Sequence, residues 1–223
     1  MRSSQKTTVG ETAQFHLGGG TEGASGTLRM DANDLEFSGT INGALASGTA
    51  KHGAVISFAS KTDLLLTNTS NIDAGGDGYD GGHIELFSNN SLLVGGTLDA
   101  GSSSNSTLTL HSRYDNLVLG ADISVADGPS VEATEDNNAL IMDGCMILFG
   151  PTTKVTTKNA IHGIARGFSA SPTLVAWAAP GWSAELPVDS PSVLFESPSD
   201  DLFPTDLQKT QWFGDYGAEF AWA

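Results

Sequence analysis

Short runs of alternating hydrophobic and polar residues, each ended by turn-forming residues, run along most of the chain, most clearly in residues 81–101. Ile84 and Leu86 flank a glutamate, and Leu92 and Val94 follow after an Asn-Asn turn. Such alternation is typical of a strand with one buried face. A Gly-Gly pair then separates a third apolar run from the second. The stretch therefore predicts three short strands that form one coil of a β-solenoid.

The same phrase recurs before and after this stretch, which indicates a repeat architecture. One apolar residue of the third run marks each copy: Ile41, Ile72, Leu98, Ile123 and Val155. The markers are 31, 26, 25 and 32 residues apart, and the extra residues fall in 44–52, 75–81 and 127–138. We expect those segments to leave the stack at one corner as loops. An internal ladder is predicted from equivalent positions: Met30, Phe58, Leu86, Leu110 and Met142.

The predicted fold is all-β, a right-handed parallel β-helix of about five coils over residues 27–165. Residues 1–26 are expected to form a partial coil or an N-terminal cap, because an uncapped solenoid end exposes unpaired strand edges. Composition changes after about residue 165, where six of the eight Pro and all four Trp lie in 171–223. Residues 166–223 are therefore predicted to be a C-terminal cap or docking segment.

Aromatic residues of this last segment are candidates for a self-association interface, because Trp and Phe are common interface anchors. The candidates are Trp177, Trp182, Phe195, Trp212, Phe213 and Trp222. Residues 173–177 and 192–195 are predicted strands, and residues 206–213 are a predicted short helix with an Asp cap. Packing of the segment along the solenoid, as a cap or flap, is the alternative.

The charge balance excludes some partners. Lys and Arg number 10 and Asp and Glu 26, which gives 10 − 26 = −16. Nucleic acid is not an expected partner, because its non-specific binding depends on Lys and Arg. No apolar run is long enough to cross a bilayer, so no membrane span is predicted. The single cysteine, Cys145, has no partner for an internal disulfide and is expected in the core.

Two phrases, residues 78–86 and 92–101, resemble the "GGxIxL … L … GxIDAxG" phrase of filamentous-haemagglutinin-like exoproteins of bacterial two-partner secretion. Ile72-Asp73-Ala74-Gly75 repeats its ending. The resemblance covers roughly residues 27–160. It implies a right-handed parallel β-helix that belongs to a surface-exposed or secreted adhesin or filament, and hence an extracellular or cell-surface location.

One glycine-rich loop, residues 75–82, also resembles the calcium-binding nonapeptide of RTX proteins. Asp73, Asp77 and Asp80 are its candidate calcium ligands. The motif occurs once, whereas stacked copies normally complete the oxygen shell of calcium. A loop without a cation is therefore the alternative, and no other cofactor is expected.

These observations favour a non-catalytic structural or adhesive module that self-associates and has a glycan or host-surface ligand as a further partner. The alternative is a carbohydrate-active or glycan-binding β-helix, with Tyr79 and Tyr114 as exposed aromatic residues. Glu36 and Glu85 are expected to point outward two coils apart, about 9.6 Å by strand spacing. That distance lies within the range used by paired carboxylates in glycosidases.

Overall fold

The computed structural model of the 223-residue chain describes residues 5–18, 25–43, 53–75, 81–101, 106–125, 140–144, 147–149, 153–157, 161–165, 176–178, 183–185 and 193–196. Every regular element in these ranges is a β-strand, and all the strand pairs are parallel. The all-β parallel solenoid predicted from the alternation is therefore confirmed. No helix in the described ranges is long and apolar enough to cross a membrane.

The strands form three sheets of seven. Sheet A contains the longest strands: β3 (Thr27–Ala32), β6 (Val55–Ser60), β9 (His83–Ser88), β12 (Thr107–Ser112), β15 (Leu140–Gly144), β18 (Ile161–Ala165) and β21 (Val193–Glu196). Sheet B contains β1 (Lys6–Val9), β4 (Asp34–Phe37), β7 (Leu64–Leu66), β10 (Leu92–Val94), β13 (Leu117–Leu119), β16 (Ile147–Phe149) and β19 (Ala176–Ala178). Sheet C contains β2 (Gln14–His16), β5 (Thr40–Asn42), β8 (Asn71–Asp73), β11 (Thr97–Asp99), β14 (Asp122–Val125), β17 (Lys154–Thr157) and β20 (Ser183–Glu185).

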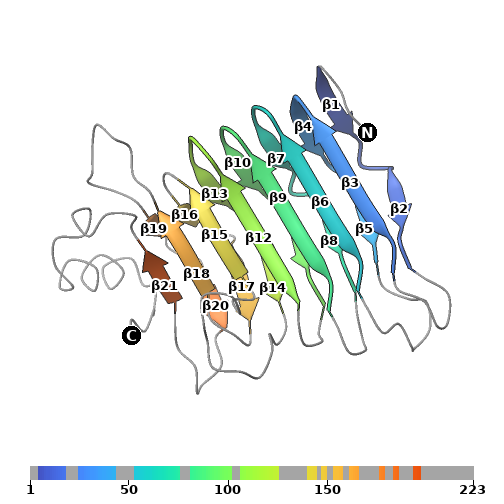
Figure 1. Cartoon of the computed structure of the whole chain (residues 1–223). Helices are drawn as coiled ribbons and strands as arrows, with labels where there is room; N and C mark the ends of the chain where they lie inside the picture. Colours follow the sequence, from blue (N-terminus) through green and yellow to red (C-terminus); the bar gives the residue numbers. More distant parts are fainter. Residues whose placement is uncertain are drawn as a thin grey trace, which may run out of the picture.

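Each coil takes one strand from sheet B, then one from sheet C, then one from sheet A. Sheet A forms the near layer in Figure 1, and its strands point to the upper left. The chain rises along the near layer, and its coils advance from the blue one at the right to the red one at the left. Rotation in this sense with an advance to the left makes the β-helix right-handed. Seven strands at about 4.8 Å spacing make a stack roughly 29 Å long.

The stack has one more coil at each end than the five that the apolar markers identify. Phe15 in β2 pairs with Ile41, and Ala184 in β20 pairs with Val155, so both extend the marker column. Neither residue is Ile, Leu or Val, which is why the marker pattern missed these coils. Parallel pairing is made by backbone groups that nearly every residue carries, so a coil can continue where the apolar phrase fades.

The internal ladder predicted for sheet A is confirmed by the strand register. The residues paired in sequence are Met30, Phe58, Leu86, Leu110 and Met142. Met30 is 6% exposed and the other four are fully buried. Phe37 of sheet B packs on this ladder, with its ring centroid 5.1 Å from that of Phe58. The core therefore runs along the axis of the stack as the alternation indicated.

Buried serines form the corner between sheets A and B. Ser60, Ser88 and Ser112 occupy equivalent positions, and each is at most 2% exposed. The Oγ atom of Ser112 lies 2.9 Å from the carbonyl oxygen of Asp115 in its own turn and 2.6 Å from that of Asn90 in the preceding turn, and these two acceptors share its single O–H. The other two serines repeat this double contact. A polar residue at this inward position therefore satisfies two turn carbonyls.

The predicted loop segments 44–52, 75–81 and 127–138 all interrupt the chain between a strand of sheet C and the next strand of sheet A. Most of their residues lie outside the described ranges, but the flanking strands place the interruptions at the same corner. From β1 to β14 the other two corners are short turns whose backbone groups hydrogen-bond from coil to coil. Insertions there would break those bonds, which explains why the variation in length in this part of the stack collects at one corner. Between β18 and β19, in contrast, ten residues separate a strand of sheet A from the next strand of sheet B.

Candidate interaction surfaces

The outer face of sheet A carries a column of residues one position beyond the internal ladder. Strand register aligns Asp31, Ala59, Phe87, His111 and Asp143 in this column. The rings of Phe87 and His111 stack with centroids 4.9 Å apart and planes 10° apart. The Nδ1 atom of His111 lies 2.8 Å from the carboxylate of Asp143. The column therefore brings an aromatic ring, an imidazole and a carboxylate side by side from three successive coils.

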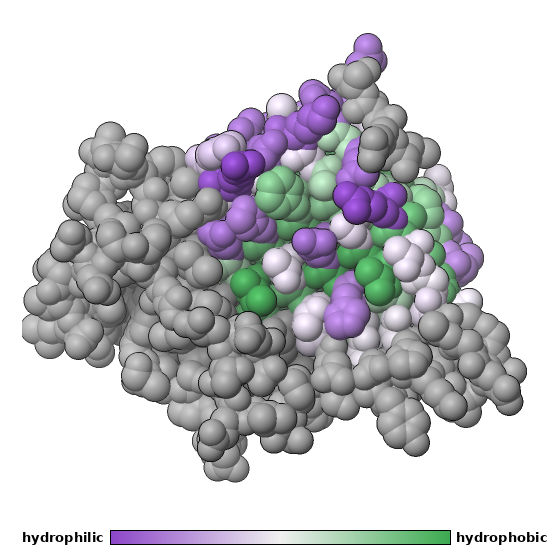
Figure 2. Space-filling view, viewed as in Figure 1, coloured by the Kyte–Doolittle hydropathy of each residue, from purple (hydrophilic) through white to green (hydrophobic). Residues whose placement is uncertain are grey.

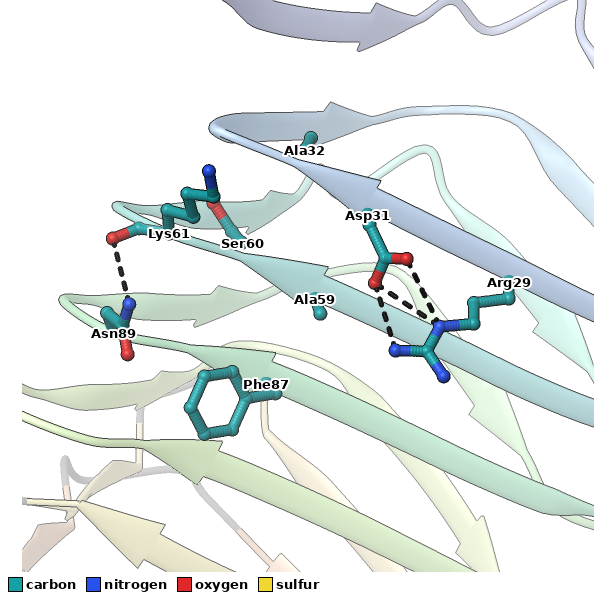
Figure 3. A pocket seen from close by; sticks show the side chains of 8 residues that line it. All are labelled: Arg29, Asp31, Ala32, Ala59, Ser60, Lys61, Phe87 and Asn89. Carbon is teal, nitrogen blue, oxygen red and sulfur yellow. Dashed lines mark hydrogen bonds and ion pairs between the residues drawn. The ribbon is translucent and has the colours of Figure 1, made fainter. Parts of the chain in front are cut away.

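A shallow hollow of about 340 Å³ lies at the start of this column. It is lined by Arg29, Asp31, Ala32, Ala59, Ser60, Lys61, Phe87 and Asn89. The guanidinium of Arg29 and the carboxylate of Asp31 form an ion pair at 3.2 Å, and the Asn89 amide donates to the Lys61 carbonyl at 3.2 Å (Figure 3). Figure 2 shows this face as a mosaic of hydrophilic and hydrophobic residues.

Cationic side chains gather on this side of the molecule. Among the described side chains, the Lys and Arg residues are Lys6, Arg29, Lys61 and Arg113. Lys61 and Arg113 follow equivalent serines of the A–B corner, and Arg29 faces the same hollow as Lys61. The Arg113 guanidinium lies 4.8 Å from the ring centroid of Tyr114, which is 60% exposed. Three of these four cations therefore lie on or beside sheet A of a protein with net charge −16.

The outer face of sheet B is different, because its strands of three residues present only their middle residue outward. Strand register aligns apolar residues at five positions: Leu65, Leu93 and Val118, whose side chains the structure describes, and then Leu148 and Trp177, which continue the column by the register of their backbones. Leu93 is 38% exposed, and Leu65 and Val118 are half-buried. We call these five residues the sheet B row. Apolar surface rimmed by polar turns commonly marks an interaction site.

Sheet C has no comparable row in its described part. Its outward positions in successive coils are polar, for example Thr40, Asn71 and Thr97 on one side of the buried residue and Asn42, Asp73 and Asp99 on the other. The apolar character of the sheet B row is therefore a property of one face and not of the solenoid as a whole.

The first coil leaves its end of the core open. Val9, Phe15 and Leu28 are only partly buried, although they point inward. Their partners in the next coil are Phe37, Ile41 and Ile56, which are all 0% exposed. The difference arises because each inner residue is covered by the coils on both of its sides. In the part of the chain that the structure describes, no strand pairs with the outer edges of β1, β2 and β3.

Asp73, one of the candidate calcium ligands, holds a corner of the coil. Its Oδ1 atom accepts the backbone N–H of Gly75 at 2.7 Å, and Asp99 accepts that of Gly101 at 2.8 Å in the same way. Both glycines have positive φ, 66° and 98°, where a side chain would be strained. The Asp-Ala-Gly phrase therefore forms a tight corner even at Asp99, which no RTX-like loop follows.

The other two candidate ligands, Asp77 and Asp80, lie outside the described residues. Within the described ranges, no group of three or more His, Cys, Asp or Glu side chains could hold a metal ion. The calcium site thus stays a prediction.

Glu36 and Glu85, considered as a carboxylate pair only for the carbohydrate-active alternative, do not lie on one sheet. Glu36 lies in β4 of sheet B and Glu85 in β9 of sheet A, so the two carboxylates point from different faces. Glu36 instead forms an ion pair with Lys6, whose ammonium group donates a hydrogen bond to the carboxylate at 2.7 Å. This hydrogen bond and the attraction between the two charges raise the pKa of Lys6. Glu85 accepts the hydroxyl of Ser57 at 3.3 Å. Alternation predicted that both residues point outward, but not that a corner separates them.

The candidate interface residues are only partly covered by the described ranges. Trp177 lies in β19 and Phe195 in β21, where their backbones pair with Leu148 and Gly163. Trp182, Trp212, Phe213 and Trp222 lie outside the described residues, as do Cys145 and Tyr79. Among these candidates, Trp177 is the one that strand register assigns to the sheet B row.

Sequence reasoning missed both outer rows, although the signals were present. The column of Phe87, His111 and Asp143 follows from the internal ladder by a shift of one residue. The sheet B row is indicated in the sequence by three apolar residues in succession, as in Leu64–Leu66. A three-residue strand with one solvent-exposed face should instead have a polar residue in the middle. Comparisons with protein-family models, with curated proteins and with solved structures find no match. The functional argument therefore depends on these surfaces and on the resemblance of the repeat phrase.

Proposed function

We propose that the chain is a non-catalytic structural or adhesive module that self-associates end to end, at the cell surface or outside the cell. The observation that carries the proposal is the open first coil, where Val9, Phe15 and Leu28 are only partly buried beside three strand edges that pair with no other described strand. A second copy that adds its last coil there would bury this surface and continue all three sheets. Because the two joined surfaces differ, such contacts repeat into an oligomer or filament.

The resemblance to filamentous-haemagglutinin-like exoproteins supports the same proposal, and the corner role of Asp73 and Asp99 explains why their phrase fits a coil. No resident cofactor is part of the proposal. Calcium bound by Asp73, Asp77 and Asp80 would be an addition that orders one loop, and it is tested by its effect on assembly.

Replacing Phe15 by Asp is expected to abolish end-to-end association, because a carboxylate on the open end cannot be buried without a partner. Light scattering across protein concentration, with electron microscopy, measures this, with and without calcium. The mean particle mass of the parent protein should increase with concentration, and the variant should stay monomeric. His16→Asp is the matched control, because the neighbouring His16 is exposed on the outer face. A monomeric parent, or equal loss in both variants, would contradict end-to-end assembly.

Glycan binding on sheet A is a second candidate function, favoured by the hollow beside Phe87. Its lining combines an aromatic ring, on which the apolar face of a sugar could stack, with Lys61 and with Arg29, whose guanidinium is ion-paired with Asp31 in the same hollow. The cations favour a sugar that carries a carboxylate. The ligand would thus be an acidic glycan containing uronate residues.

Phe87→Ala is expected to weaken binding of oligouronates about fivefold, because stacking on an aromatic ring contributes on the order of 1 kcal/mol. Isothermal titration with oligogalacturonate and a neutral oligosaccharide of equal length measures the effect. Leu93→Ala, on sheet B, is the control and should bind like the parent. No binding by the parent would reject the candidate, and release of new reducing or unsaturated ends would show catalysis instead.

A further inference from the structure

The sheet B row is an apolar surface for which the proposed end-to-end contact has no use. End contacts involve the strand edges and the open core, whereas the row points sideways from the stack. The five aligned residues extend over about 19 Å at the spacing of parallel strands. End-to-end association would therefore leave the row exposed, and another segment or molecule must bind there if this apolar surface is to be buried.

We propose that the row is the docking site of the C-terminal segment of the same chain, residues 197–223. The first argument is where the chain leaves the stack. Each earlier strand of sheet A leads through a corner into a strand of sheet B, as β3 leads into β4. The last strand, β21, ends at Glu196, so the segment begins at the corner that borders sheet B.

The starting point also lies close to one end of the row. Strand β19, with Trp177, belongs to the same coil as β21, and it is the last strand of sheet B. The segment contains 27 residues, from 197 to 223. An extended chain of that length reaches up to about 90 Å, several times the length of the row. Reach therefore does not limit docking, and a segment tied at one end has a high effective concentration at the row.

Composition is the second argument. The segment is rich in large apolar residues, namely Leu202, Phe203, Leu207, Trp212, Phe213, Phe220 and Trp222. It also carries five acidic residues and one Lys, so like charge would keep it from an acidic surface. The five residues of the sheet B row are apolar and uncharged, and the carboxylate next to them in the same column, that of Glu36 beside Leu65, is ion-paired with Lys6. The row and the segment thus match in the chemistry that drives apolar docking.

The test uses the full chain with Trp177→Phe and Trp182→Phe, so that fluorescence reports Trp212 and Trp222. Acrylamide quenching and hydrogen exchange of residues 202–222 measure the protection of the segment. Leu93→Asp places a charge in the middle of the row and is expected to remove this protection. Val55→Asp is the matched control, because Val55 is 40% exposed on sheet A against 38% for Leu93 on sheet B.

Circular dichroism and thermal unfolding check that both variants keep the solenoid. Protection that is present in the parent, independent of protein concentration, and lost only in Leu93→Asp supports the proposal. Absence of protection in the parent, or survival in Leu93→Asp, overturns it. Protection that grows with concentration also overturns it, because the row would then hold a second copy. Phe15→Asp should leave the protection intact, so failure of end-to-end assembly is distinguished from failure of docking.

Discussion

Replacing Phe58 by Ala is expected to lower the free energy of unfolding by about 3–5 kcal/mol, because the change leaves a cavity in the middle of the internal ladder. Phe58 is fully buried, lies between Met30 and Leu86 in the register, and packs its ring 5.1 Å from that of Phe37. Neighbours on both sides are fixed by backbone pairing, so the coils cannot close the cavity. Chemical denaturation, followed by circular dichroism, measures the loss.

The control for this variant is Phe87→Ala, which removes the same ring from the outer face of the next coil. Phe87 contacts His111 but is only half-buried, so we expect a loss of about 1 kcal/mol. Similar losses of stability in the two variants would contradict the structure, in which Phe58 is buried in the core and Phe87 lies on the outer face of sheet A.

Replacing Gly96 by Ala is expected to destabilise the protein by about 3–5 kcal/mol, from backbone strain and lost hydrogen bonds together. Gly96 has a φ of +74°, and an added Cβ would clash with the backbone oxygen of Ser70 in the preceding coil. That oxygen accepts the N–H of Thr97 at 2.9 Å, so relief of the clash pulls a hydrogen bond between coils apart.

A matched glycine makes this prediction specific. Gly10 occupies the same corner between sheets B and C in the first coil, and its added Cβ would meet nothing within 4 Å. Gly10→Ala should change stability by no more than about 0.5 kcal/mol. Thermal unfolding should place Gly96→Ala roughly 6–20 °C below the parent, by the usual relation between stability and Tm for a chain of this size. Equal Tm values for the two variants would contradict the corner geometry.

On the outer surfaces, the repeat pattern predicted which residues point outward but not which sheet each of them belongs to. Alternation predicted that Glu36 and Glu85 face outward, and both do, but they lie on different sheets. Counting coils along the sequence cannot tell which side of a triangular coil a residue occupies unless all three corners are located. The corner at Asp34 separates the strand of Glu36 from sheet A, and it has only one residue, Asn33, between two strands.

The number of coils was underestimated for a related reason. Apolar markers identify a coil only where its side chains follow the repeat, and they fade at β2 and at β20. Backbone pairing continues through both strands, because hydrogen bonds between neighbouring coils do not require a particular side chain. A sequence pattern therefore locates the middle of a solenoid better than its ends.

The sequence by itself determined the architecture and the core. A period of two separates inward from outward residues, and equal phrases in successive coils must stack, so the repeat alone is enough to align Met30, Phe58 and Leu86. Only the tertiary structure decided which outward residues become neighbours. Strand register brings Phe87 to His111 and Leu93 to Val118 from different coils, and the corners assign the first pair to sheet A and the second to sheet B. Outward residues are not required to be apolar, so the burial that drives folding leaves little trace of their arrangement in the sequence.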